Sequence, residues 1–181
     1  MKMNRQTKLA YAAGVIDGEG CISIYRCRVF GNGIYGGRIK NYRMKVNITQ
    51  KDGRIIDWFV GNFGGTAYLH WKGTKTGYSH EWVISHQKAS AFLKQILPFL
   101  IYKKPQAEIA IRFQDRIKQR MSCNERRLNE HELAERNNLC EEIGKLKTIS
   151  TYSKQPNIQR RVNNAALTTK RENALKGDAI V

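Results

Sequence analysis

The sequence predicts an α+β domain in which helices cover one face of a four-stranded antiparallel sheet. The hydrophobic periodicity switches repeatedly between the spacing typical of helices and the alternation typical of strands. Each predicted strand has only one apolar side, which is typical of an antiparallel sheet covered on one face. A chain of 181 residues can bury such a core in one domain, or in one domain with an extension.

The first half of this domain is predicted to contain two helices and, between them, two strands. Lys8–Gly18 has helical spacing and runs into glycines, which end helices readily. Cys21–Val29 and Ile39–Gln50 alternate like strands on either side of a glycine-rich loop. Arg54–Phe63 carries an apolar stripe at helical spacing, and a pair of glycines ends it.

The second half is predicted to contain a hairpin followed by helices. Thr66–Lys72 and Ser79–Ser85 flank the segment GTKTG and are expected to pair. Lys88–Leu97 is predicted to be a helix that Pro98 stops, and Gln106–Arg120 is predicted to be another amphipathic helix. Up to residue 120 the predicted order is therefore α-β-β-α-β-β-α-α.

Charge and hydrophobic pattern divide the chain near residue 121. Residues 1–121 hold 21 of the 32 Lys and Arg, only 7 of the 15 Asp and Glu, and every Trp and Phe. They form the predicted core domain. Residues 122–147 are predicted to be an accessory polar helix with a sparse Leu and Ile stripe, and residues 148–181 a basic polar tail that is either loose or follows DNA.

The formal net charge of +17 points to a polyanion as partner, above all nucleic acid. A solvated basic surface and an anionic membrane surface are the alternatives. No run of 18 apolar residues could span a membrane, and the N-terminus does not resemble a secretory signal. The four cysteines form no CxxC pair and the four histidines lie at no zinc-finger spacing, so we expect reduced cysteines in an intracellular protein without a zinc site.

The polar sides of the predicted strands, with their loops, are rich in residues that bind DNA. Arg can pair with guanine and Asn with adenine in the major groove, while other cations contact phosphates. A merely solvated sheet face is the alternative. The candidate DNA-binding residues are Tyr25, Arg26, Arg28, Lys40, Asn41, Arg43, Lys45, Asn47, Tyr68, His70, Lys72 and Lys75.

The segment AAGVIDGEG (12–20) resembles the signature of the LAGLIDADG homing endonucleases. VNITQKDGR (46–54), LPFLIYKKPQAEI (97–109) and the order of elements are also similar to the single-motif, homodimeric members. The resemblance covers about residues 7–120 and implies a saddle-shaped sheet and two subunits joined through their motif helices.

Small residues recur on one side of the motif helix, where they would let a second helix approach closely. A two-fold dimer is the simplest way to provide that second helix. The alternative is that these residues belong to an ordinary core. The small residues are Ala10, Gly14 and Gly18, and Ala13 with Ile16 would extend the contact.

The resemblance assigns the metal site to Glu19, the last acid of the motif, and to the Gly18 carbonyl. Two such carboxylates at a dyad would attract a divalent cation, so Mg²⁺ is the expected cofactor, which Mn²⁺ could replace. The family usually has Asp where this chain has Glu19. Asp17 is expected to have a structural role near the helix end.

The resemblance also implies three further catalytic residues. Gln50 matches the residue that positions the attacking water, Lys103 the basic residue that acts on that water or on the phosphate, and Arg54 a second nearby cation. A shift of one residue would exchange Lys103 with Lys104. The family often has another Lys two positions on, where this chain has Pro105. Candidates for that missing cation are Arg116, Lys118 and Arg120.

These observations predict a site-specific endonuclease that makes double-strand breaks in a long pseudo-palindromic DNA site, with double-stranded DNA and a second copy of the chain as partners. An intron RNA maturase, with intron RNA as partner, and a DNA-binding protein that does not cleave are the alternatives on the same fold. An HNH nuclease is set aside, since no paired His and Asn cluster follows a ββα pattern.

Overall fold

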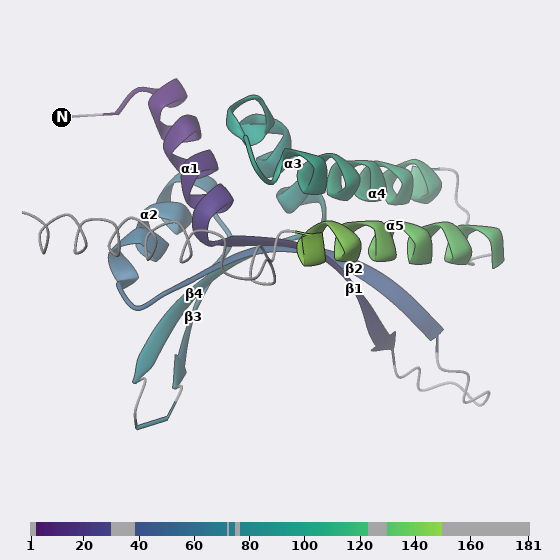
Figure 1. The fold of residues 1–181 in the computed structure, drawn as a ribbon, viewed down its shortest axis with the longest axis horizontal. Coiled ribbons are helices and arrows are strands. Elements are labelled where there is room, and N and C mark those ends of the chain that lie inside the picture. The colour runs from purple at the N-terminus through teal and green to yellow at the C-terminus, as the bar shows by residue number, and fades with distance from the viewer. Residues whose placement is uncertain (1–2, 30–38, 72, 75–76, 123–129, 150–181) are drawn as a thin grey trace, which may run out of the picture. The chain divides into compact units, whose positions relative to one another are not determined.

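The computed structural model describes residues 3–29, 39–71, 73–74, 77–122 and 130–149. As far as residue 122 their order of helices and strands confirms the predicted α-β-β-α-β-β-α-α, and one more helix follows (Figure 1). The helices are α1 (Arg5–Glu19), α2 (Gly53–Phe63), α3 (His86–Ile96), α4 (Lys104–Ser122) and α5 (Glu130–Ile149), with a short 3-10 helix η1 (Leu97–Phe99). The strands are β1 (Gly20–Val29), β2 (Ile39–Gln50), β3 (Thr66–Trp71) and β4 (Tyr78–Ser85).

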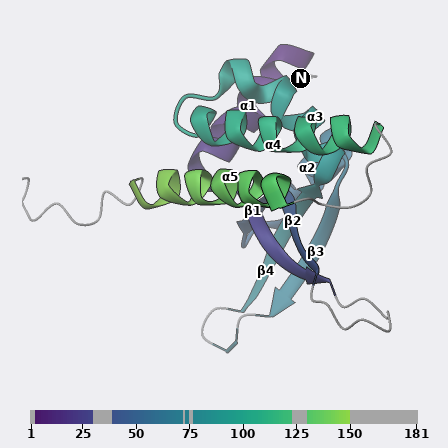
Figure 2. The same cartoon turned by 90° about the vertical axis from the view of Figure 1, so that its right-hand side faces the viewer.

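The four strands form one antiparallel sheet in the order β1-β2-β4-β3. Helices α1 to α4 lie on one side of this sheet in both views (Figures 1 and 2). The strand ends curve away from the helices and leave the opposite face open. The predicted α+β class, with an antiparallel sheet covered on one face, is therefore confirmed.

Strand alternation builds the core beneath the helices. Ile22, Met44, Val46 and Ile48 are fully buried on the covered face, since alternate side chains of a strand point to the same side. An aromatic cluster from α2, β4 and α3 completes the core, with ring centroids 4.9 to 6.3 Å apart. Its members are Phe59, Trp82 and Phe92.

The Trp82 indole fixes the turn between α2 and β3. Its Nε1 donates a hydrogen bond of 2.7 Å to the carbonyl of Gly64. Gly65 has a φ of +95°, and a Cβ there would lie 2.7 Å from the same Nε1. Both the backbone conformation and the close approach therefore require glycine at position 65.

The helices differ from the predicted ones mainly at their ends. α1 begins at Arg5 because the side chain of Asn4 caps it, accepting a hydrogen bond of 2.8 Å from the Thr7 amide. α4 begins at Lys104, since proline is tolerated in a first helical turn and Pro105 does not delay it. Within the range 122–147, where a polar helix was predicted, α5 begins at Glu130, and residues 123–129 lie outside the described residues.

Residues 1–147 form one compact unit. Within this unit, Leu139 and Ile143 of α5 are buried, so α5 contributes to the same core as the sheet. The predicted tail lies outside the described residues from position 150 onward. Among the helices that the structure describes, none is both long and apolar enough to cross a bilayer.

Candidate functional site

One side of α1 is open along its length. Ala10, Gly14 and Gly18 are exposed on it, and a Cβ placed at Gly14 or Gly18 would meet no atom within 4 Å. Ala13 does not share this side, which corrects its predicted place. Ala13 and Ile16 are fully buried against the chain's own sheet, because the helical rotation turns them away from the open side.

The carboxylate of Glu19 is exposed at the C-terminal end of α1. The chain turns there directly into β1. This turn requires glycine at position 20, because a Cβ there would lie 2.8 Å from the Ile16 backbone. The last carbonyls of a helix lack intrahelical partners and form the negative end of its dipole. The last turn of α1 contains no basic residue, so Glu19 and these carbonyls form an electronegative end.

The neighbouring acid Asp17 has a structural role, as predicted. Its carboxylate accepts hydrogen bonds from the amides of Ile101 (2.8 Å), Tyr102 (3.3 Å) and Lys103 (2.8 Å). Asp17 therefore holds the segment before α4 against the end of α1.

The segment that Asp17 holds before α4 places the ammonium of Lys103 at the end of α1. The Lys103 Nζ donates hydrogen bonds to the carbonyls of Ile16 (2.9 Å) and Asp17 (2.8 Å). Burial lowers the pKa of Lys103, and the negative charges of Asp17 and Glu19 oppose that shift. Lys104 is exposed at the start of α4, and Lys103 is the one of the two that binds α1.

Gln50 and Arg54 flank the turn between β2 and α2. Gln50 is the last residue of β2, two positions beyond Ile48, which pairs with Gly20 next to Glu19. Arg54 is bound to the carboxylate of Asp52, the N-cap of α2. The side-chain and backbone hydrogen bonds from Arg54 hold the pKa of Asp52 at about 2. Arg54 therefore pairs with the N-cap residue of its own helix.

The strand register gathers six of the candidate DNA-binding residues on the open face of the sheet. The pairs Tyr25–Arg43, Lys45–Ser85 and Asn47–Val83 place them there, as do Tyr68–Glu81 and His70–Ser79. All six are exposed or half-buried. They are Tyr25, Arg43, Lys45, Asn47, Tyr68 and His70.

Glu81 was missed by the sequence reasoning, which considered only cations, amides and aromatic residues on this face. Its Oε1 accepts from Asn47 Nδ2 at 3.0 Å and lies 4.0 Å from Lys45 Nζ. Its Oε2 lies 2.8 Å from His70 Nε2. Its alternation within β4, opposed to Trp82, was the available signal. Glu81 orients three of the predicted DNA-binding side chains.

Arg26 lies on the covered face, which corrects its predicted place. It pairs with Tyr42, and its guanidinium donates to Tyr42 Oη at 3.1 Å and to Asn137 of α5. The strand positions of Arg28, Lys40 and Asn41 are described, but their side chains are not. Lys72 and Lys75 lie outside the described residues.

No family model and no curated protein matches the sequence. Solved structures do match. An archaeal intron-encoded homing endonuclease, I-Vdi141I, complexed with DNA, has a TM-score of 0.62 and 21% identity over 79% of this chain and 86% of its own. The homing endonuclease I-CvuI, in complex with its target, has a TM-score of 0.61 and 21% identity over 78% and 82%. I-LtrWI, described as a LAGLIDADG homing endonuclease bound to target DNA, has a TM-score of 0.54 and 19% identity over 77% and 45%.

The chain has the fold of the LAGLIDADG homing endonucleases.

The end of α1 is not a complete metal site by itself within the described part of the chain. No group of three or more His, Cys, Asp or Glu within the described ranges is arranged to hold a metal ion. The end of α1 offers one exposed carboxylate and helix-terminal carbonyls. Oxygen donors at the negative end of a helix suit a hard divalent cation, which proteins bind through one or two carboxylates together with water and phosphate oxygens.

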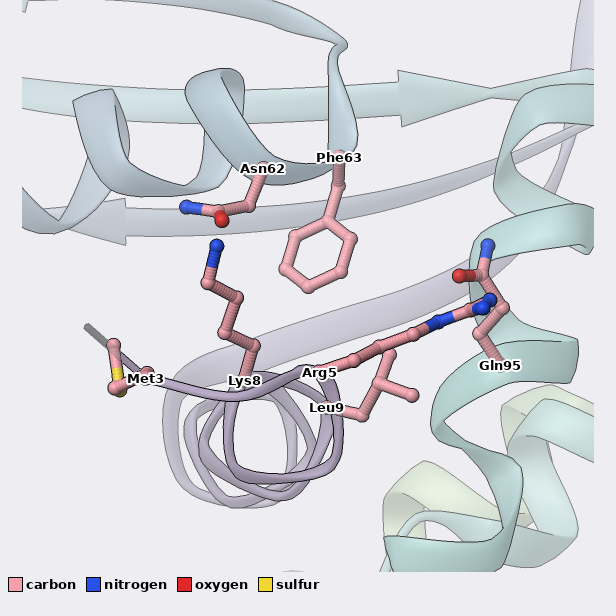
Figure 3. Close-up of a pocket in the computed structure, with 7 residues that line it drawn as sticks. All are labelled: Met3, Arg5, Lys8, Leu9, Asn62, Phe63 and Gln95. Atoms are coloured by element: carbon pink, nitrogen blue, oxygen red, sulfur yellow. The ribbon is translucent and has the colours of Figure 1, made fainter.

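A pocket of about 260 Å³ lies at the other end of α1, between α1, α2 and α3 (Figure 3). Arg5 reaches toward Gln95 and Lys8 toward Asn62, with Phe63 between them. The N-terminal half of α1 lines this pocket, whereas Glu19 is the last residue of the helix. The pocket is therefore separate from Glu19 and the carbonyls at the end of the helix.

Proposed function

We propose that two copies of this chain form a metal-dependent endonuclease that cuts both strands of a long pseudo-palindromic DNA site. The observation that carries the proposal is the end of α1, where exposed Glu19 lies beside carbonyls that bind the Lys103 ammonium. I-CvuI and I-Vdi141I, which share the fold, are homing endonucleases in complex with a target and with DNA.

The open sheet face supports a role in reading double-stranded DNA. It presents exposed Tyr and Arg side chains beside Lys and Asn, on a chain with a net charge of +17. The major groove admits a β-ribbon, and such side chains distinguish base edges there. Many moderately selective contacts, doubled by a dimer, would specify a long site.

The open side of α1 supports association with a second copy. Ile101 and Tyr102, which Asp17 holds at the end of the same helix, have exposed fractions of 89% and 50%. Apolar side chains beside a glycine-lined helix suit a close helix-to-helix interface. The match to I-LtrWI covers less than half of that longer chain, which leaves room there for a second unit.

Glu19 and the Gly18 carbonyl would hold the metal, Mg²⁺ by preference or Mn²⁺ in its place. Glu19 makes no ion pair with any residue that the structure describes. Two Glu19 carboxylates at a dyad repel each other unless a cation lies between them. Complexes of I-CvuI in the presence of Ca and of Mg agree with divalent metal use. When bound, the ion would lower the pKa of a water molecule and stabilise the leaving oxygen.

The chain's own residues would arrange the phosphate and the water. Lys103, held by two carbonyls, presents a fixed positive charge where negative charge develops on the phosphate. Gln50 would orient the attacking water. Arg54 would leave Asp52 and contact the DNA phosphate instead, since an exposed ion pair such as Arg54–Asp52 is weak.

A cleavage assay on a randomised duplex library tests this function. We expect the protein with Mg²⁺ to cut a defined subset, whose sequenced ends reveal a pseudo-palindrome, and EDTA to abolish cutting. Glu19→Gln should retain binding to the selected duplex without cutting it, whereas Glu108→Gln, which alters an exposed acid of α4, should cut normally. A wild type that binds duplexes selectively yet never cuts them would favour the DNA-binding alternative. Selective binding of intron RNA would favour the maturase.

A further inference from the structure

Helix α5 is fixed against strand β1 by side chains along one of its faces. The thiol of Cys140 donates to the Ile24 carbonyl at 3.2 Å. Asn137 accepts from Tyr42 Oη at 2.9 Å and from the guanidinium of Arg26. Ile24 and Arg26 belong to β1, and Tyr42 belongs to β2, which pairs with β1. These contacts therefore hold α5 along this edge of the sheet.

These contacts direct the last turn of α5 to the beginning of β1. Lys147 is half-buried there, with its Nζ 3.6 Å from the Sγ of Cys21. Cys21 follows Gly20, two residues after Glu19. Lys147 is also close enough to Lys103 for its charge to lower the pKa of that residue. A residue distant in sequence therefore lies beside the candidate cleavage site.

The placement of two ammonium groups near one another calls for an anion. The charges of Lys103 and Lys147 repel each other, and the half-buried positions of both residues weaken solvent screening. Lys147 is the basic residue of the last turn of α5, where a cation is favourable to the helix dipole, but that effect does not require a half-buried position beside Cys21. A DNA phosphate bound at the end of α1 would satisfy both Lys103 and Lys147.

We propose that Lys147 is a further cation of the cleavage site, supplied by α5, and that it contacts a backbone phosphate of the DNA next to Glu19. This inference rests on the proposed nuclease function. Lys147 would supply a cation to the cleavage site in a chain that has Pro105 where the family often has a second Lys. The earlier candidate Arg116 pairs instead with Glu132 and Glu135 of α5.

The test compares Lys147→Gln with Lys145→Gln, which removes the same charge from an exposed position of the same helix. With enzyme in excess over the selected duplex and Mg²⁺ present, we expect Lys147→Gln to cut roughly tenfold or more slowly. Lys145→Gln should cut at the wild-type rate, and Lys147→Arg should restore most of the loss because it keeps the charge. The salt dependence of duplex binding, measured in Ca²⁺, should have a slope lower by about 2 in Lys147→Gln, because each of the two copies on the duplex loses one phosphate contact.

Equal cleavage rates for Lys147→Gln and wild type would overturn the inference, as would a Lys147→Arg variant as slow as Lys147→Gln. A wild type that binds the duplex but does not cut it contradicts the proposed nuclease instead. In that case the salt dependence still decides, because an unchanged slope in Lys147→Gln rules out the phosphate contact.

Discussion

At the scale of single residues, the two acids of the motif, Asp17 and Glu19, have different surroundings although they are only two positions apart. Asp17 accepts three backbone hydrogen bonds, and Glu19 is exposed at the helix end. The difference follows from helical rotation, which turns Asp17 toward the segment before α4. The exposed acid is therefore the one available to a metal ion.

Asp17→Asn should unfold more easily than wild type and also cut DNA more slowly. An amide cannot accept at both positions where the carboxylate does, so at least one backbone amide loses its partner, at a cost of about 1–3 kcal/mol. The displaced segment carries Lys103 with it. Chemical denaturation and single-turnover cleavage measure the two effects. Asp57→Asn, on the exposed surface of α2, is the control. Wild-type stability in Asp17→Asn would contradict this role.

Glu81→Gln should weaken discrimination between the selected duplex and unrelated DNA. Glu81 holds Asn47 and His70, and its negative charge opposes nonspecific phosphate binding on the open face. Loss of one well-oriented contact reduces discrimination by about 1–3 kcal/mol per base pair. Binding competition at constant salt measures the ratio of the two affinities. An unchanged ratio would show that Glu81 does not shape the reading surface.

At the scale of elements, alternation in the sequence was enough to predict the sheet. Ile39–Gln50 was predicted with the bounds of β2, and from Tyr42 to Gln50 its buried residues alternate with exposed or half-buried ones. The start of α1 was missed because Asn4 lies outside the apolar pattern that identified the helix. The same alternation decides the face on which each side chain lies. Arg26 follows Ile22 and Ile24 at a spacing of two and therefore lies on the covered face, but the prediction placed it on the polar face.

The N-terminus of α2 should lose stability in acid through Asp52. The pKa of Asp52 is lowered from 3.8 to about 2. Its stabilising effect is therefore fully present above pH 3.8 and is lost as the pH falls to about 2. In Asp52→Asn, unfolding monitored by circular dichroism should lack this component of the acid transition. If wild type and Asp52→Asn lose stability in parallel over that range, the capping pair with Arg54 contributes nothing.

At the scale of the whole molecule, the sequence could predict the sites that lie within one motif but not those built by long-range packing. Glu19 and the open side of α1 follow from local spacing. The approach of Lys147 to Cys21 depends on how α5 packs on β1, and no local pattern encodes that contact. The burial of Ala13 likewise depends on which side of α1 the sheet covers.

Association through α1 predicts opposite effects of one substitution on folding and on assembly. Gly14→Leu has open space in the single chain and replaces a helical glycine, so it should stabilise the chain by about 1 kcal/mol. The same side chain would hold a second helix apart. We expect the wild type to be dimeric by ultracentrifugation, with a Tm that rises with protein concentration. Gly14→Leu should be monomeric, with a Tm independent of concentration, and should not make double-strand breaks.

Gly61→Leu provides the matched control, because Gly61 is an exposed glycine of α2 that also has open space around it. It should gain the same helix stability while remaining dimeric and active. A Gly14→Leu protein that associates as tightly as the wild type would place the interface elsewhere on the chain. Glu19 would then lack its partner carboxylate at the dyad, and the metal site would require a different second ligand.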